Sequence, residues 1–465
     1  MNKYKFFRIS IVWLSTVLLF ACEPEEESIS TSPDIKLSFS QDTIFFDTVF
    51  TTVGSVTKRL SVTNPSNKAV NIANISLGNT QSSAYAVHIN GISDTKVENV
   101  KLLGGDSLLV LVEVFIDPQD NDLPFIVQDS LVFETNGNVQ DVKLISWGQD
   151  ANFYRSGLQG IDGNTTWTAN RPYVIFDSVL VQKDATLTIE EGTRIYMNPG
   201  AYLFVNGTLK IQGVAEKPVT FQGVRQEKAY AKAPGQWGGI FFLEQSHQNE
   251  IYSAIIKNAT VGIHLGTPDE DEEPDLVLAN SIIENMAATG IQCFTSDLLM
   301  YNTLIDNCIQ SGLACWAGGN YVLYHNTIAN YQFDFFRETP SLILSNYFNT
   351  GEDILREDLY VDMRNTIVWG VLNDEVQFFA DAESETKMEL NLRNNIFKTQ
   401  LTDFLKGNDN QLNTDPKFTS PIEQLFTLDT LSPAKDKGQK LFVSHDLLDN
   451  ARDENPDIGA YERIE

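Results

Sequence analysis

Apolar and polar residues alternate at period two in the first third of the chain. Runs such as TKRLSVTN at 57–64, SLLVLVEVFI at 107–116 and SLVFETN at 130–136 follow this pattern, with turn residues between them. Strict alternation predicts strands with one buried face. Short strands without a helical stretch between them favour a β-sandwich, which we place at residues 35–150.

A longer repeat begins after this region. An asparagine recurs after apolar runs at spacings of 22, 24, 20, 19 and 29 residues. The residues two and four positions before each asparagine are apolar or aromatic, so they share a face of a strand. Repeats of this length are typical of solenoids. We therefore predict a parallel β-helix at residues 151–413, with an asparagine at one bend of each coil. This structural asparagine column consists of Asn280, Asn302, Asn326, Asn346, Asn365 and Asn394.

Coils of a β-helix lie about 4.8 Å apart, so an asparagine at a bend can bond to the asparagine or backbone of the next coil. Cys293 and Cys315 are 22 residues apart and should also be stacked neighbours. We expect two buried thiols, and a disulfide between them is the alternative.

Three short motifs in the first region are VTN at 62–64, GGD at 104–106 and VFIDP at 114–118. Together they resemble immunoglobulin-like domains of the ASPM–SPD-2–Hydin type. That resemblance implies an immunoglobulin-like sandwich that acts as a spacer or an interaction domain.

The second region contains GTL at 207–209, PVTF at 218–221 and WGGI at 237–240. This series resembles the first coils of right-handed parallel β-helix proteins of the pectate-lyase-like superfamily. The fold class that we predict is all-β: an immunoglobulin-like β-sandwich followed by a right-handed single-stranded parallel β-helix.

The last residues carry DPKF at 415–418, SPAKD at 432–436 and DIGAYE at 457–462. These motifs resemble the C-terminal segment of secreted bacterial β-helix proteins. We expect residues 414–465 to close the open end of the stack, because an uncovered last coil is a sheet edge that invites association.

The first residues form a targeting signal. A basic start, MNKYKFFR, precedes an apolar stretch at 9–21 that is too short to span a bilayer. LFAC at 19–22 resembles a bacterial lipobox, which implies a signal peptide at residues 1–21 and lipidation of Cys22. Residues 22–34 are acidic and rich in serine, which predicts a flexible tether. Acidic residues directly after that cysteine resemble a surface-export signal, so we expect a surface-exposed outer-membrane lipoprotein.

The charge balance limits the partners of the protein. The chain has 33 basic and 62 acidic residues, a net charge of −29. This excess argues against nucleic acid as a partner and against docking on an anionic membrane surface. The membrane is therefore expected to be contacted only through the N-terminal lipid anchor, and a polysaccharide is the candidate ligand.

One set of outward positions could carry chemistry. Tyr301, His325, Arg364 and Arg393 directly precede asparagines of the repeat, and Asp362 lies nearby. In a lyase, His325 or Tyr301 would be the base, and the two arginines would neutralise a uronate. The alternative is that these are solvated side chains flanking the bends.

A second set is the pair Glu284 and Asp306, whose backbones would lie about 5 Å apart on adjacent coils. Such a pair could serve a retaining hydrolase or form a Ca²⁺ site. The alternative is a charged, solvated face in which Lys257 pairs with Glu284. We find no cysteine and histidine spacing typical of a metal site, so no other cofactor is predicted.

Two classes of function follow. The first is a surface protein that binds glycans or mediates adhesion without catalysis. The second is a polysaccharide lyase, or another carbohydrate-active enzyme, that acts on acidic polysaccharide. The Asp-rich and GHG signatures of polygalacturonases and the Arg/Lys pattern of pectate lyases are absent from the sequence, which favours the first class.

Overall fold

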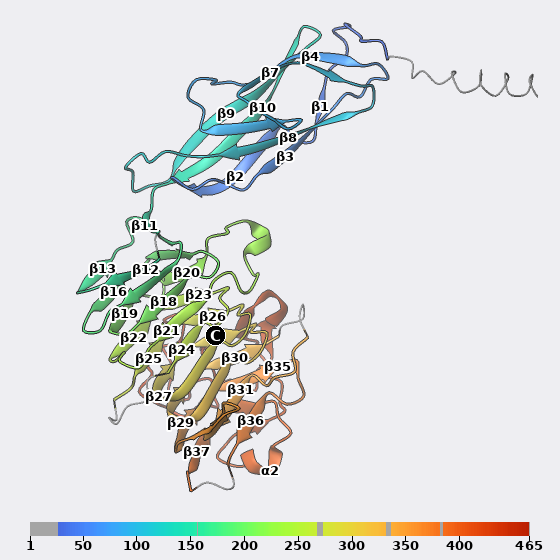
Figure 1. Cartoon of the computed structure of the whole chain (residues 1–465). Helices are drawn as coiled ribbons and strands as arrows, with labels where there is room; N and C mark the ends of the chain where they lie inside the picture. The colour runs from blue at the N-terminus through green and yellow to red at the C-terminus, as the bar shows by residue number, and fades with distance from the viewer. Residues whose placement is uncertain (1–26, 156, 267–272, 332–335, 382–384, 465) are drawn as a thin grey trace, which may run out of the picture. The chain divides into compact units, whose positions relative to one another are not determined.

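The chain forms two compact units that divide between Asp150 and Ala151 (Figure 1). The computed structural model describes residues 27–155, 157–266, 273–331, 336–381 and 385–464. Within these ranges the one α-helix is α2 (Thr402–Leu405), and the regular structure is otherwise strands with two short 3-10 turns. No helix in this part of the chain is long and apolar enough to cross a membrane. The all-β prediction is confirmed.

The first unit is a sandwich of two five-stranded sheets, ordered β1-β3-β8-β5-β6 and β2-β10-β9-β4-β7. Neighbouring strands are antiparallel except for β2 and β10, which are parallel. The first sheet contains β1 (Ser38–Phe39), β3 (Lys58–Thr63), β5 (Tyr85–Ile89), β6 (Ile92–Ser93) and β8 (Ser107–Val114). The second contains β2 (Thr43–Phe50), β4 (Val70–Leu77), β7 (Lys96–Leu102), β9 (Phe125–Thr135) and β10 (Asn138–Gln149).

Alternation places one face of each sheet in the core of the sandwich. In β8 the buried residues are every second one, namely Leu108, Val110, Val112 and Val114. The buried side chain of Asn64, which follows β3, donates to the carbonyl oxygens of Lys68, Leu102 and Leu103 at 2.8, 3.3 and 3.1 Å. One amide thus joins three carbonyls of two loops at the end of the sandwich.

The described part of the predicted tether is bound to the sandwich. Backbone N–H of Ser30 donates to Ala69 O at 2.8 Å, and the Glu27 carboxylate accepts from Gly104 N at 3.1 and 3.2 Å. The flexible tether that we placed at 22–34 is therefore wrong for residues 27–34, because their backbone finds partners on the sandwich. Cys22 and the predicted signal peptide lie outside the described residues.

The second unit is the predicted right-handed parallel β-helix, and its coils have three strand faces. Faces 1 and 2 belong to one sheet because β27 (Ile291–Tyr301) and β29 (Leu313–Tyr324) run through both. Face 1 otherwise contains β12 (Leu158–Ile161), β15 (Ser178–Val181), β18 (Tyr202–Val205), β21 (Gly239–Phe242), β24 (Ile263–Leu265), β31 (Leu342–Ser345) and β36 (Val376–Phe379). Face 2 otherwise contains β13 (Thr165–Trp167), β16 (Thr186–Glu190), β19 (Thr208–Gln212), β22 (Asn249–Tyr252), β25 (Leu276–Ala279), β34 (Leu359–Arg364) and β37 (Met388–Arg393).

Face 3 is a separate eleven-stranded sheet. Its strands are β11 (Asn152–Tyr154), β14 (Tyr173–Ile175), β17 (Arg194–Met197), β20 (Val219–Gly223), β23 (Ala254–Lys257), β26 (Ile282–Glu284), β28 (Leu304–Asp306), β30 (Thr327–Asn330), β35 (Ile367–Gly370), β38 (Ile396–Phe397) and β39 (Gln411–Leu412). A hairpin of β32 (Tyr347–Asn349) and β33 (Ile354–Arg356) leaves the coils between β31 and β34.

Buried residues stack inside the helix, but in the coil of β29 the stack contains Tyr321 where the repeat predicts Val322. Leu298 aligns with Tyr321, which aligns with Val361, and all three are buried. Cys293 and Cys315 are aligned neighbours on β27 and β29, both buried and free. The predicted stacking of these two thiols is confirmed.

The column of bend residues differs from the prediction at two positions. Tyr301 aligns with Tyr324, and Leu304 aligns with Thr327, so the residue opposite Asn302 is His325. Asn326 therefore lies one place further along the chain. Asn346 is not in the column either, because it follows β31 at a different corner of the coil.

The true column is defined by its backbone. Residues Asn280, Asn302, His325, Asn365 and Asn394 have φ angles of 50°, 46°, 53°, 54° and 52°. Asparagine tolerates this left-handed conformation better than most residues, which explains why it recurs at the bend. Side chains also bond along the column, because Asn302 Nδ2 donates to Asn280 Oδ1 at 3.0 Å.

Asn326 has a different structural role in the adjacent, buried column. Its Oδ1 accepts from Thr303 N at 3.0 Å, and its Nδ2 donates to Met300 O at 3.0 Å. Asn395 bonds in the same way to Thr366 N and Met363 O. These amides satisfy backbone groups that the bend leaves without strand partners.

The C-terminal segment runs along the side of the stack. It contains β40 (Phe418–Ser420), η2 (Pro421–Glu423) and β41 (Leu425–Leu428), and its side chains form a core with the outward residues of face 3. Its hydrogen bonds extend from Asn285, which follows β26, to Gln411 in the last strand. Our expectation that 414–465 closes the open end is therefore wrong: face 3 is strongly apolar on its outside, and the segment covers that surface. The core consists of Leu304, Ala329, Ile367, Trp369, Ile396, Phe418, Phe426, Leu428, Ala434, Leu447, Ile458, Ala460 and Tyr461.

Candidate functional site

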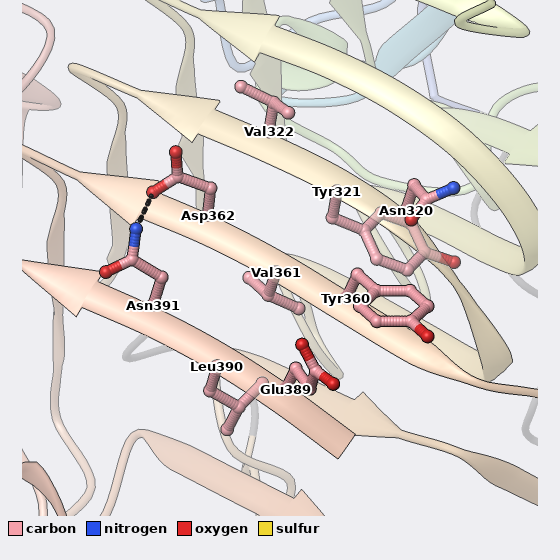
Figure 2. Close-up of a pocket in the computed structure, with 9 residues that line it drawn as sticks. All are labelled: Asn320, Tyr321, Val322, Tyr360, Val361, Asp362, Glu389, Leu390 and Asn391. Carbon is pink, nitrogen blue, oxygen red and sulfur yellow. Dashed lines mark hydrogen bonds between the residues drawn. The ribbon is translucent and has the colours of Figure 1, made fainter. Parts of the chain in front are cut away.

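A shallow groove of about 380 Å³ lies on the outer side of face 2, over β29, β34 and β37 (Figure 2). Strand alternation directs every second side chain of these strands outward. The groove is lined by Asn320, Tyr321, Val322, Tyr360, Val361, Asp362, Glu389, Leu390 and Asn391.

Polar side chains form two parallel rows across the groove. In the first row Tyr360 is aligned between Asn320 on β29 and Glu389 on β37. In the second row Asp362 is aligned with Asn391, whose Nδ2 donates to Asp362 Oδ1 at 2.8 Å (Figure 2). The rows place an aromatic ring beside carboxylate and amide groups within one or two coils.

Asp362 is the centre of a hydrogen-bond network. Arg364 donates to it through Nε and Nη2 at 2.8 and 2.9 Å, and Tyr324 Oη donates at 2.6 Å. Burial and the bond to Asp362 raise the pKa of Tyr324 to about 12. The charge of Arg364 is thus compensated by Asp362. Arg393 donates through Nε to Asn391 Oδ1 at 2.7 Å.

Four of the five predicted residues lie on this outer face. Tyr301, Arg364 and Arg393 share one aligned column with Tyr324, and Asp362 lies in the adjacent column. The ring of Phe442, from the C-terminal segment, packs against Tyr301 at a centroid distance of 5.5 Å. Burial raises the pKa of Tyr301 to about 12, which makes it a poor base near neutral pH.

His325 does not lie on this face, and its assignment as a base is wrong. Because it occupies the left-handed bend, its side chain is turned away from the outer face and is 0% exposed. Asn365 Nδ2 donates to its Nε2 at 2.8 Å. Burial, with a smaller effect of the nearby Arg452 charge, lowers the pKa of His325 well below its ordinary value.

The pair Glu284 and Asp306 is aligned on face 3, as predicted, but the C-terminal segment covers it. Asp306 is 1% exposed, and Gln424 donates to its Oδ2 at 2.8 Å. Burial raises the pKa of both carboxyls, and their mutual repulsion raises that of Asp306 further. The pair is therefore not a solvated site, since Asp306 is closed off from a substrate.

Within the described ranges, no group of three or more histidine, cysteine or acidic residues is placed so that it could hold a metal ion. Sequence reasoning missed Asn320, Tyr360 and Glu389. Each lies five positions before a residue of the bend column, so the same backward count, extended to five, would have found Tyr360 and Glu389. Counted from the predicted Asn326 it reaches Tyr321, so Asn320 also needs the correct register at His325.

Comparison with known families finds one model that is similar to part of the chain. A model described as a pectate-lyase-like β-helix domain matches residues 159–272. No curated protein matches the chain.

Three solved structures show low similarity. A family 123 glycoside hydrolase from Clostridium perfringens is 6% identical over 27% of this chain and 30% of its own length, with a TM-score of 0.20. A protein of unknown function from Porphyromonas gingivalis W83 is 14% identical over 28% and 59%, with a TM-score of 0.19. A PapD-like domain of human CEP192 is 11% identical over 28% and 94%, with a TM-score of 0.18. Similarity at this level supports no statement about function.

Proposed function

We propose that this protein binds carbohydrate in the groove on the outer side of face 2 and does not cleave it. The observation that carries the proposal is the position of Tyr360, aligned between Asn320 and Glu389. An aromatic ring offers an apolar surface to the C–H groups of a sugar, while carboxylates and amides bond its hydroxyls. The match of residues 159–272 to a pectate-lyase-like domain agrees with a role connected to carbohydrate.

The lining of the groove favours a hydroxyl-rich sugar over an acidic one. It contains two carboxylates, Asp362 and Glu389, and no lysine or arginine. A uronate would meet like charge there. Of the two arginines that bond to lining residues, Arg364 is already paired with Asp362, and Arg393 donates to the Asn391 amide. A sugar hydroxyl can instead donate to either carboxylate.

Binding is favoured over catalysis because the proposed bases are not suited to proton abstraction. His325 is buried under the C-terminal segment, and the pKa of Tyr301 is raised to about 12. Tyr324, which aligns with Tyr301, also has its pKa raised to about 12. A lyase needs a base that reaches the substrate and is deprotonated at its working pH.

The test is affinity electrophoresis of the protein through gels that contain single polysaccharides. Tyr360→Ala should weaken binding by tenfold or more, since truncating a central aromatic contact costs about 2 kcal/mol or more. Glu389→Gln should weaken it less. The matched control Glu244→Gln, at an exposed acid in the turn between β21 and β22, should leave binding unchanged. Appearance of unsaturated uronate ends in the same incubations would overturn the non-catalytic assignment.

We further propose that lipidation of Cys22 anchors the protein in an outer membrane, facing the exterior, and that the sandwich acts as a spacer. The lipobox-like LFAC at 19–22 supports this. Incorporation of labelled palmitate should be lost in Cys22→Ser. Protease added to whole cells should digest the anchored protein, and complete protection would refute surface exposure.

A further inference from the structure

A line of aromatic side chains follows the outer side of face 1, away from the groove on face 2. One column of outward residues is aligned from coil to coil across the whole face. The aligned residues are Leu180, Phe204, Phe241, His264, Gln292, Ala314, Ile343 and Gln377. The column contains no acidic or basic side chain other than His264, although the chain as a whole carries a net charge of −29.

The rings of this column and of its neighbours contact one another in sequence. Tyr202 stacks on Phe204 and meets Phe241 edge-on, both at 5.2 Å between centroids. Phe241 stacks on His264 at 4.8 Å, and His264 lies 5.7 Å from Phe294. Each ring is partly exposed, so the contacts form a continuous apolar surface one or two side chains wide.

The hairpin β32–β33 limits this surface at one end. Phe348 of the hairpin meets Phe294 at 5.0 Å and Trp316 at 5.6 Å, and the column residues Ala314 and Ile343 are buried. The open part therefore extends from Leu180 to Gln292 over five successive coils. At about 4.8 Å per coil it is about 19 Å long. We name this part, with the flanking rings of Tyr202 and Phe294, the aromatic strip.

The aromatic strip is uncharged at neutral pH. Burial lowers the pKa of His264, so its imidazole is neutral there. Gln292 is the polar neighbour of His264 in the column and supplies an amide. The strip thus differs in chemistry from the groove on face 2, whose lining has two carboxylates.

We propose that the aromatic strip is a second carbohydrate-binding surface, which takes an uncharged polysaccharide chain lying along the axis of the β-helix. The surface is straight, narrow and periodic, with one side chain of the column per coil. A polymer of repeated sugar rings presents apolar C–H faces and hydroxyls at regular intervals, and the strip itself offers it no charge. The one carboxylate that lines a hollow beside Phe204 is that of Asp177, near the end of the strip at Leu180. The absence of charge complementarity disfavours a charged polymer, since such binding depends on paired charges.

The experiment uses the full-length protein in native gels that contain hydroxyethyl cellulose, soluble starch or polygalacturonate. We expect at least one of the two neutral polymers to retard the wild type, and added salt to leave that retardation unchanged. Phe241→Ser should reduce the affinity tenfold or more. The matched control Phe45→Ser, which removes a phenylalanine that is 64% exposed on the sandwich, should not.

A second variant keeps the test decisive if Phe241→Ser fails to fold. Gln292→Glu preserves every ring and adds one charge to the aromatic strip, and it should also weaken retardation. The proposal is overturned if neither neutral polymer retards the wild type, or if the folded variants behave as wild type. It is also overturned if Tyr360→Ala alone abolishes retardation, because binding would then belong to the groove on face 2.

Discussion

Replacing Asn326 by alanine tests the structural role that the buried column assigns to its amide. The side chain is fully buried, and it bonds the N–H of Thr303 and the carbonyl of Met300, both at 3.0 Å. In Asn326→Ala both backbone groups lose their partner inside the bend.

The expected cost follows from these two bonds. A buried donor or acceptor without a partner costs about 1–3 kcal/mol, so two such groups give about 2–6 kcal/mol. Native domains are stable by only about 5–15 kcal/mol, so the loss is a large fraction of the total. Because the damage is local, the amide of Thr303 should also exchange its hydrogen faster.

Urea unfolding followed by circular dichroism measures the free energy of unfolding, and hydrogen exchange read by mass spectrometry locates the damage. The matched control is Asn394→Gly, which keeps the left-handed bend at φ 52° and removes one half-exposed bond to Lys437 O. It should cost about 1 kcal/mol or less. If Asn326→Ala cost no more than this control, the role assigned to the buried amide would be refuted.

Three further predictions concern other buried groups. Arg337→Met should lower the free energy of unfolding, measured in urea, by about 3–5 kcal/mol. The side chains of Arg337 and Glu375 are both fully buried, so the variant leaves the Glu375 carboxylate without its cation. The double variant Arg337→Met/Glu375→Leu should recover much of this loss. Asp306→Asn should stabilise the protein relative to wild type by an amount that grows as pH rises from about 4. Because the pKa of buried Asp306 is raised, the folded wild type keeps a proton that the unfolded chain releases above pH 3.8, so wild-type stability falls as pH rises. A difference in urea midpoint between variant and wild type that stays constant with pH would contradict this. Cys293 and Cys315 should both react with a thiol reagent in the unfolded, unreduced chain and resist it when folded; a mass loss of two hydrogens would reveal a disulfide instead.

The fold could be predicted from the sequence because burial imposes periodicity. The spacing of apolar residues identified the strands of face 2 and the stacking of Cys293 on Cys315. The error at Asn326 has a physical cause, because two adjacent columns both favour asparagine. One column favours it because asparagine tolerates the left-handed backbone conformation, and the other because its side-chain amide can both donate and accept a hydrogen bond. A sequence repeat does not distinguish these uses, so the register shifted by one residue at His325.

The covering of face 3 could not be predicted from the repeat. The outward residues Leu304, Ile367 and Ile396 are apolar. From the coil pattern alone, apolar residues at these positions would be assigned to the interior of the β-helix. Only the contacts of the C-terminal segment show that a second core lies outside the coils. Glu284 and Asp306 were misjudged for the same reason, because their burial depends on residues more than a hundred positions away in sequence.

The three faces therefore differ in what they can do. Interior positions are fixed by packing, and the outer side of face 3 from β26 to β38 is covered by the C-terminal segment, so neither can meet a large ligand in the folded chain. Both proposed binding surfaces lie on the outer sides of faces 1 and 2, where neither the apolar repeat nor the bend geometry constrains the chemistry of the side chains. On face 2 those positions hold carboxylates, amides and Tyr360, and on face 1 they hold a line of uncharged rings. Substitutions there should change binding with little change in the free energy of unfolding, whereas substitutions of the inner columns should do the reverse.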